Sequence, residues 1–296
     1  AAGIGSMLKL NTEIIYQSES WQLYAVPILL YLIVGGALVI TNRNLDLKIS
    51  TKDAFIITAL SWILFTLLCS VPFIYSEVNL SVVDALFESM SGVTTTGATI
   101  LNNLDQAPKG ILIWRAILQW LGGIGIIVIA LVILPFLRIG GMQLFHLEGD
   151  DPYDKFLPKI SSVVTKIVIV YISLTTLLFI LYYLNQMTLF DALAHSLTTI
   201  STGGFSTHND SFAYFQSNSI LNIAIIFMIL GSFPFLVLAQ TTFTNISIVL
   251  KDNQIRLFLI ILIFAISIIF YLARTYVDGS TLQKLTTISF NIISII

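Results

Sequence analysis

Apolar runs of about 20 residues recur along this chain, and each is long enough to cross about 30 Å of hydrocarbon as a helix. They lie at 21–41, 54–76, 111–137, 161–184, 219–248 and 256–274. Only 10% of the residues are charged and the mean hydropathy is +0.92, whereas soluble domains have about 25% charged residues. The sequence therefore predicts an all-α polytopic membrane protein.

Three further apolar segments are too short to cross a membrane. They lie at 82–93, 189–200 and 285–296. A helix of about 12 residues reaches only part of the way through the hydrocarbon layer. Non-helical backbone at that depth must be surrounded by protein or line a water-filled cavity. We therefore expect re-entrant helices that enter and leave on the same side.

The lysines and arginines in the connectors predict the orientation. One set of connectors holds Arg43, Lys48, Lys52, Arg138, Lys155, Lys159, Lys166, Lys251 and Arg256, and the other holds Lys9, Lys109, Arg115, Arg274 and Lys284. The positive-inside rule places the richer set in the cytoplasm, so each short segment enters from outside. The net charge of -2 and the absence of a basic face argue against a nucleic-acid partner. The lone cysteine, Cys69, can form no intrachain disulfide and is expected to be a buried helix residue.

Two of the short segments belong to an internal repeat. Residues 84–99, DALFESMSGVTTTGAT, align without a gap with 191–206, DALAHSLTTISTGGFS, at an offset of 107 residues. Both follow a capping-box spacing, with Ser81 before Asp84 and Thr188 before Asp191. A weaker third copy aligns 290–296 with 87–93 at an offset of 203, which predicts that the protein continues beyond Ile296. Chance similarity of apolar helices is the alternative, but it does not explain shared polar positions at identical spacing.

The loop that follows each short helix has the composition of a cation filter. Residues 91–100, SGVTTTGATI, contain three threonines and a glycine but no charged side chain. Glycine permits backbone angles that are closed to other residues, so successive carbonyl oxygens can face one axis and replace the hydration shell of a cation. This composition favours a dehydrated monovalent cation. The candidate ion-binding residues are Thr94, Thr95, Thr96, Gly97, Ser201, Thr202, Gly203 and Gly204.

Other polar or small residues have simpler interpretations. The glycines of 122–125, GGIG, favour close helix packing over a binding site. Glu88 and His195 occupy equivalent positions in the two short helices and are expected to support the loops from behind by hydrogen bonds, with pore-lining charges as the alternative. Arg115 lies near the outer end of its helix, where its side chain could snorkel to the interface.

These residues resemble the Trk/Ktr/HKT superfamily of potassium transporters, and most of all its bacterial TrkH-type branch. The supporting stretches are VVDALFESMSGVTTTGATIL, LQWLGGIGIIVIALVILPFLRIGGMQLF and ISTGGFSTHNDSFAYF. The resemblance implies tandem helix–pore-helix–filter-loop–helix units of the potassium-channel-like type. It implies that 1–53 ends a leading helix pair with its cytoplasmic connector, that 54–139 and 160–248 are pore units 1 and 2 separated by a cytoplasmic loop at 140–159, and that 249–296 begins an incomplete pore unit 3.

The resemblance also implies a function and partners. It implies potassium uptake across the bacterial cytoplasmic (inner) membrane, either as symport with H⁺ or Na⁺ or as channel-like flow. K⁺ would be the transported ion at the filter residues, with no other metal and no cofactor. The implied partners are a second copy in a homodimer and a cytoplasmic nucleotide-binding regulatory ring of the TrkA type, for which 138–160 is a possible contact.

Two other classes of function are alternatives. An intramembrane enzyme would need paired aspartates, a Ser–His pair or a metal motif. The three histidines, His146, His195 and His208, have no such spacing, and Asp84 and Asp191 are explained as helix-start residues, so we expect no enzyme activity. A non-transporting scaffold, or the remnant of a longer gene, is the other alternative.

Overall fold

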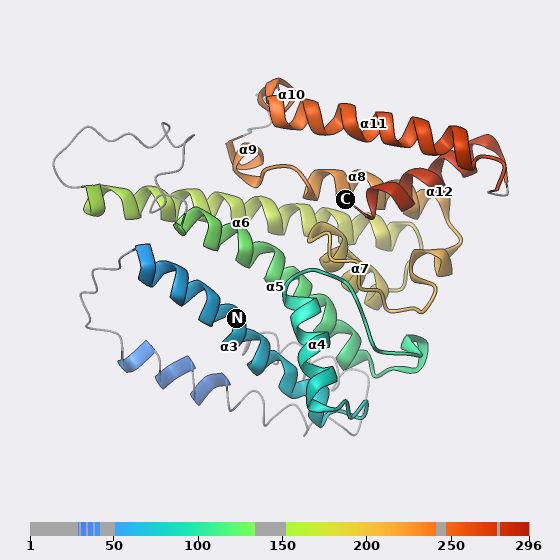
Figure 1. The fold of residues 1–296 in the computed structure, drawn as a ribbon. Coiled ribbons are helices and arrows are strands. Elements are labelled where there is room, and N and C mark those ends of the chain that lie inside the picture. Colours follow the sequence, from blue (N-terminus) through green and yellow to red (C-terminus); the bar gives the residue numbers. More distant parts are fainter. Residues whose placement is uncertain are drawn as a thin grey trace. The chain divides into compact units, whose positions relative to one another are not determined.

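The computed structural model describes residues 29, 31–33, 35–37, 39–41, 51–133, 152–240, 247–276 and 279–295 (Figure 1). Within these ranges the chain forms helices and loops and no strand. The prediction of an all-α protein is therefore confirmed. The chain packs as two bodies: the N-terminal body comprises 1–152 and 205–209, and the C-terminal body comprises 153–204 and 210–296. The boundaries predicted for the pore units stay predictions.

In the N-terminal body a short helix lies against two long ones. Helix α3 (Thr51–Tyr75) is followed by α4 (Val82–Val93), the 3₁₀ turn η1 (Leu104–Gln106) and α5 (Lys109–Ile133). Helix α4 packs against both α3 and α5 (Figure 1). Polar side chains fasten the three helices together: Ser89 Oγ donates to the Thr66 carbonyl at 2.9 Å, and Trp114 Nε1 donates to the Cys69 carbonyl at 3.1 Å. Cys69 is fully buried, as predicted.

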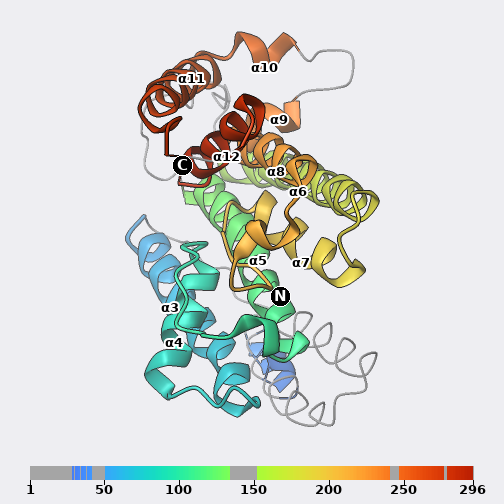
Figure 2. The same cartoon turned by 90° about the vertical axis from the view of Figure 1, so that its right-hand side faces the viewer.

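The C-terminal body begins with the same succession of elements and continues with a further helix pair. It contains α6 (Pro152–Leu184), α7 (Leu189–Ile200), η4 (Ser211–Phe215), α8 (Asn218–Gly231), α9 (Phe235–Gln240), α10 (Ser247–Lys251), α11 (Asn253–Ala273) and α12 (Thr281–Ile293). Helix α7 packs against α8, and α12 lies against α8 and α11 (Figure 2). Helix α6 starts at Pro152, so residues 152–159 of the predicted cytoplasmic loop are helical rather than loop.

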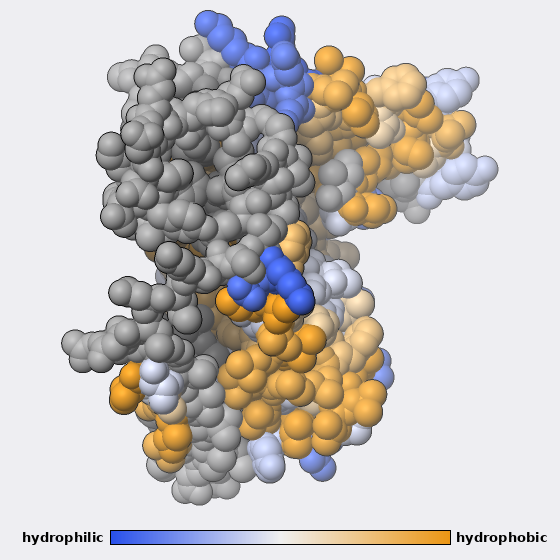
Figure 3. All heavy atoms as spheres, turned by 60° about the vertical axis from the view of Figure 1, so that its left-hand side comes forward, coloured by the Kyte–Doolittle hydropathy of each residue, from blue (hydrophilic) through white to orange (hydrophobic). Residues whose placement is uncertain are grey.

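Four helices among the described residues are long and apolar enough to cross a membrane. They span Phe55–Tyr75, Lys109–Ile129, Ser162–Leu184 and Asn253–Ala273, in agreement with four of the predicted spans. Side chains of the first and last of these are mostly exposed, with 22% and 11% of the residues buried, which suits contact with lipid. Figure 3 shows one face of the molecule, on which hydrophobic side chains cover much of the surface that is not grey. The predicted span at 21–41 lies largely outside the described residues.

The prediction of one continuous span at 219–248 is wrong. The segment is divided into α8, which ends at Gly231, and the shorter helices α9 and α10. The break falls at Ser232 and Phe233, directly before Pro234. Proline has no N–H to donate to the preceding turn, and it disfavours helical angles in the residue before it. Hydropathy alone could not reveal this break, because the residues on both sides of it are apolar.

The three short segments are short helices, as predicted. Helices α4, α7 and α12 have 12, 12 and 13 residues. Each begins at a side-chain cap: the hydroxyls of Ser81, Thr188 and Ser280 accept backbone N–H groups of their first turns. Asp84 and Asp191 serve these caps, since each carboxylate accepts the hydroxyl hydrogen of the capping residue, at 2.7 and 2.6 Å. Their interpretation as helix-start residues is confirmed.

Candidate functional site

The loops that follow α4 and α7 have the same backbone conformation. Thr95 and Thr202 have positive φ angles of 56° and 51°, and Gly97 and Gly204 have φ angles of 77° and 84°. These are the two pairs that align at the offset of 107 residues. Positive φ is rare for a β-branched residue such as threonine and costs on the order of 1–3 kcal/mol. Its occurrence at both equivalent positions shows that the repeat extends to the shape of the loop.

Hydrogen bonds within the two loops also correspond. Two backbone bonds turn each chain back against the end of its short helix, at the same positions in both copies. In the first pair, the Thr95 N–H donates to the Gly92 carbonyl at 3.0 Å and the Thr202 N–H donates to the Thr199 carbonyl at 3.1 Å. In the second pair, the Thr96 N–H donates to the Ser91 carbonyl and the Gly203 N–H donates to the Thr198 carbonyl, both at 2.9 Å. Each loop is therefore held against its own helix.

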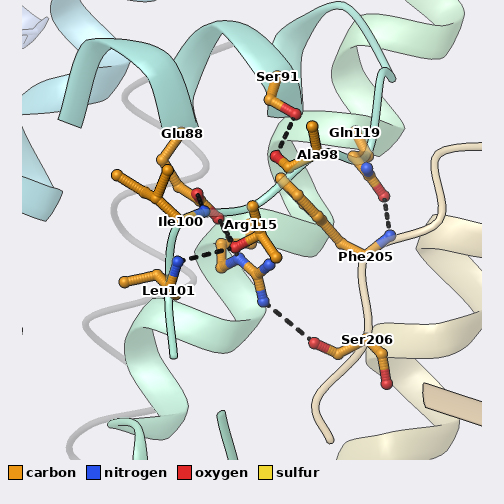
Figure 4. Close-up of polar contacts among 10 residues, drawn as sticks. Glu88, Ser91, Ala98, Ile100, Leu101, Arg115, Gln119, Phe205 and Ser206 are labelled. Carbon is orange, nitrogen blue, oxygen red and sulfur yellow. Dashed lines mark hydrogen bonds and ion pairs between the residues drawn. The ribbon is translucent and has the colours of Figure 1, made fainter. Parts of the chain in front are cut away.

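The candidate ion-binding residues differ in exposure. Thr94 and Thr96 are exposed, and their hydroxyl oxygens lie 2.7 Å apart. Thr95 and Gly97 are partly buried, Ser201 and Gly203 are buried, and Thr202 and Gly204 are exposed. The carbonyl of Ala98 accepts the Ser91 hydroxyl at 2.5 Å, so the first loop is tied back to α4 directly after Gly97 (Figure 4).

A cavity of about 830 Å³ lies beside the second loop, within the C-terminal body. Thr202 and Gly204 line it, together with residues of η4, α8 and α12. Its polar lining includes Gln283 and Asn291 of α12, Ser294 directly after that helix, and one acidic residue, Asp210. Two of the predicted ion-binding residues therefore face a space large enough to hold water and small ions.

A glycine brings the following helix close to each short helix. An added Cβ at Gly122 of α5 would lie 1.9 Å from the Val93 carbonyl oxygen, and one at Gly231 of α8 would lie 2.7 Å from the Ile200 carbonyl oxygen. Val93 and Ile200 are equivalent residues of the repeat, at the ends of α4 and α7. The interpretation of the 122–125 glycines as a packing face is confirmed for Gly122. Gly125 has open space beside it.

Glu88 supports the first loop from behind, as predicted. Its carboxylate is fully buried and accepts the Thr99 hydroxyl at 2.8 Å and the Ile100 N–H at 3.1 Å (Figure 4). The charge is balanced by Arg115 of α5, whose Nε lies 2.7 Å from Glu88 Oε1. Arg115 is 1% exposed, so the expectation that it snorkels to the interface is wrong. A buried carboxylate at this depth requires such a partner.

Arg115 and Gln119 also hold the chain that leaves the second loop. Arg115 Nη1 donates to the Ser206 carbonyl at 3.1 Å, and its guanidinium lies 4.0 Å from the centre of the Phe205 ring. Gln119 Oε1 accepts the Phe205 N–H at 3.1 Å (Figure 4). Gln119 was not predicted as a site residue. Its position one turn after Arg115 on an apolar helix was the available signal, since a buried amide needs partners.

His195 replaces Glu88 in the second repeat but has different surroundings. It is fully buried, and its Nδ1 lies 2.9 Å from the Asp191 carbonyl oxygen within α7. The rings of Phe212 and Phe215 from η4 pack edge-on against it, at centroid distances of 5.1 and 5.2 Å. His195 is therefore a buried structural residue, and the pore-lining alternative is not supported.

A polar cluster ties η1 to residues 205–209 within the N-terminal body. Asp105 Oδ1 lies 2.6 Å from His208 Nδ1, and Asn209 Nδ2 donates to Asp105 Oδ2 at 2.9 Å. Asn209 Oδ1 in turn accepts the Leu104 N–H at 2.8 Å. The hydrogen bond from His208 is the main cause that lowers the pKa of Asp105 below its ordinary value.

We expect the titration of Asp105 to report this contact. Its midpoint should lie below the ordinary value of about 3.9. Because the folded-state pKa is lowered, the contact stabilises the loop above about pH 4 and is lost as the pH falls through the lowered pKa. Carboxyl ¹³C NMR of the protein in lipid nanodiscs measures the midpoint. It should rise in His208→Ala and stay unchanged in the control Asp210→Asn; a midpoint that does not rise in His208→Ala would contradict the assignment.

No group of three or more His, Cys, Asp or Glu side chains that could hold a metal ion occurs among the described residues. The two loops themselves offer backbone carbonyls and hydroxyls. Such groups can coordinate a monovalent cation, because they offer oxygen atoms without a net charge.

Comparison with known proteins places this arrangement in a family. The model of the TrkH family, described as cation transport protein, matches residues 23–294. The Trk system potassium uptake protein TrkI of Halomonas elongata is 34% identical over 258 residues, covering 87% of this chain and 52% of the relative. The corresponding TrkG protein of Escherichia coli K12 is 36% identical over 253 residues, covering 83% and 52%.

A solved structure has the same fold. The crystal structure of the potassium transporter TrkH from Vibrio parahaemolyticus superposes with a TM-score of 0.88 at 32% sequence identity. The match covers 99% of this chain and 61% of that protein. The chain spans about half the length of the curated relatives it matches. The repeated loops, the spanning helices and these similarities lead to one conclusion: the chain belongs to the TrkH family of cation transport proteins.

Proposed function

We propose that the full-length gene product takes up K⁺ across the bacterial cytoplasmic membrane, and that carbonyl oxygens of 94–97 and 201–204 bind the ion as it passes. The observation that carries the proposal is the second occurrence of one unusual loop. Two loops share positive φ at a threonine and a glycine, and they share the hydrogen bonds that fold them back on their helices. Two strained loops of one shape suit a common ligand.

The backbone angles suit carbonyl coordination. In a regular strand successive carbonyls point in opposite directions, whereas positive φ at every second residue turns them toward the same side. Thr95 and Gly97 have this spacing, as do Thr202 and Gly204. Rings of such carbonyls can replace the water around a dehydrated K⁺ ion. The cavity beside Thr202 and Gly204 offers space for an ion to approach the second loop.

The electrostatics favour a monovalent cation. Neither loop contains a charged side chain, and the Glu88 carboxylate behind the first loop is neutralised by Arg115. The cavity beside the second loop adds one carboxylate, Asp210. A divalent cation site would be expected to offer several carboxylates. An anion site would instead offer backbone N–H groups or free basic side chains. Transport, rather than catalysis, is the activity that this arrangement supports.

The orientation of the chain in the membrane is inferred from its sequence, and its partners are inferred from its family. The excess of Lys and Arg in one set of connectors places that set, including 138–160, in the cytoplasm. The relatives are named as parts of a Trk system, which implies further components. We propose that a nucleotide-binding ring docks on this cytoplasmic side and that two copies of the transporter associate. Crosslinking from cysteines introduced in 138–160 tests the first contact.

Serine in place of Gly97 or Gly204 should weaken the preference for K⁺ over Na⁺. Each glycine has positive φ, which costs a residue with a Cβ about 1–2 kcal/mol, so the loop should relax from its ion-binding shape. We expect the ratio of Rb⁺ to Na⁺ flux to fall about tenfold, which corresponds to about 1.4 kcal/mol. The measurement is flux into vesicles at matched protein levels, with growth of a K⁺-uptake-deficient host on low K⁺.

Thr198→Ala provides the matched control. Thr198 is buried in α7, and its hydroxyl contacts the His195 carbonyl at 3.3 Å, so its loss should change stability more than ion choice. Selectivity that is unchanged in both serine variants would refute the assignment of these loops as the filter. A wild-type protein without selective Rb⁺ flux would refute K⁺ uptake itself.

A further inference from the structure

We propose that Gln119 of α5 is a positioning residue for the second loop, and that it sets the direction of the Gly204 carbonyl. The inference rests on the proposed function, in which that carbonyl contacts the ion. Gln119 itself does not contact the ion. It acts through the peptide unit that joins Gly204 to Phe205.

The geometry of one peptide carries the argument. Gln119 Oε1 accepts the Phe205 N–H at 3.1 Å, and both residues are buried, at 0% and 3% exposure. The peptide bond is planar, and no cis peptide occurs among the described residues. In a planar trans peptide the C=O and the N–H point in opposite directions. The hydrogen bond to Gln119 therefore turns the Gly204 carbonyl away from α5.

Arg115 holds the chain two peptides further on, at the carbonyl of Ser206. Its Nη1 donates to the Ser206 carbonyl at 3.1 Å while its guanidinium stacks on the Phe205 ring at 4.0 Å. Arg115 is in turn held by Glu88, at 2.7 Å. The Phe205 N–H and the Ser206 carbonyl are thus both anchored to α5. Anchors at both ends of this short stretch, together with the Phe205 ring against the guanidinium, limit rotation of the Gly204–Phe205 peptide.

The first loop is held at this point by its own short helix. Its carbonyl at Ala98, the residue after Gly97, accepts the hydroxyl of Ser91 in its own short helix. Gly122 and Gly231 contact equivalent carbonyls, so α5 and α8 correspond at an offset of 109 residues, at which Met228 takes the place of Gln119 and offers no amide oxygen. Support from Gln119 is therefore specific to the second loop, and it is not an automatic result of the repeat.

Two substitutions separate positioning from packing. Gln119→Met keeps the length of the side chain but removes the acceptor, whereas Gln254→Met makes the same chemical change away from the loop. In the full-length gene product, we expect the ratio of Rb⁺ to Na⁺ flux to fall several-fold, on the order of five- to tenfold, in Gln119→Met. Gln254→Met, an exposed position at the start of α11, is the control and should leave the ratio unchanged.

If Gln119→Met does not accumulate in the membrane, a smaller substitution tests the same point. Gln119→Asn retains the amide but is one methylene too short to reach Phe205, so it should lower the ratio in the same way. Hydrogen exchange of the Phe205 amide should also become faster in both variants. A wild-type ratio of Rb⁺ to Na⁺ flux in Gln119→Met or Gln119→Asn, at matched protein levels, would overturn this inference but not the proposed function. A wild-type protein that shows no selective flux would overturn the proposed function and the inference with it.

Discussion

Replacing Gly122 by alanine should greatly lower the amount of folded protein in the membrane, whereas the same change at Gly125 should have little effect. The added Cβ at Gly122 would lie 1.9 Å from the Val93 carbonyl oxygen and 2.7 Å from its carbon. Both atoms are backbone at the end of α4, so no side chain can rotate away. The helices must separate, and we expect a loss of stability of about 3 kcal/mol, the upper part of the usual range for overpacking.

Gly125 is the matched control on the same helix. An added Cβ there meets no atom within 4 Å, and alanine is the better helix former. Thermal unfolding of detergent-extracted protein, followed by size-exclusion chromatography, compares the two variants directly. Gly231→Ala should fall between them, because its closest contact is 2.7 Å. Equal melting temperatures for the variants at 122 and 125 would contradict the close packing of α5 on α4.

Loss of Arg115 should be the second severe change. Arg115→Met removes the partner of the fully buried Glu88 carboxylate and leaves its charge uncompensated. Breaking a buried ion pair in this way costs about 3–5 kcal/mol. The contacts to Ser206 and Phe205 would be lost as well. We therefore expect little folded protein, and poor ion selectivity in whatever protein remains.

A double substitution tests whether the charge is the cause. Glu88→Gln together with Arg115→Met removes both charges, while the new amide can still accept a hydrogen bond from Thr99 or Ile100. The double variant should be more stable than Arg115→Met alone, by a difference that a thermodynamic cycle over the four proteins measures. If both proteins melt at the same temperature, the charge of Glu88 contributes nothing and the loss comes from packing.

Much of the fold could be predicted from the sequence, because hydropathy and helix caps are local signals. Ser81 and Thr188 mark the starts of α4 and α7, and the apolar runs mark the long helices. Hydropathy does not reveal the break at Ser232 and Phe233, whereas Pro234 is a signal against a continuous helix. The broad outline depends on composition, whereas this detail depends on one residue.

The candidate site was predictable in part. The repeat located both loops and their glycines, and positive φ at Gly97 and Gly204 agrees with the expectation that these residues need unusual angles. Positive φ at Thr95 and Thr202 could not be predicted, because threonine rarely adopts it. The contact between Gln119 and Phe205 could not be predicted either, because the two residues are 86 positions apart in the sequence.

The membership of residues 205–209 in the N-terminal body has a consequence for the biosynthesis of the protein. Their partners in η1 and α5 leave the ribosome well before them, and N-terminal segments generally fold first during synthesis. Arg115, Gln119 and Asp105 can therefore be in place as a finished surface when Phe205 emerges. The nascent segment 205–209 then packs against a surface formed by an earlier part of the same polypeptide.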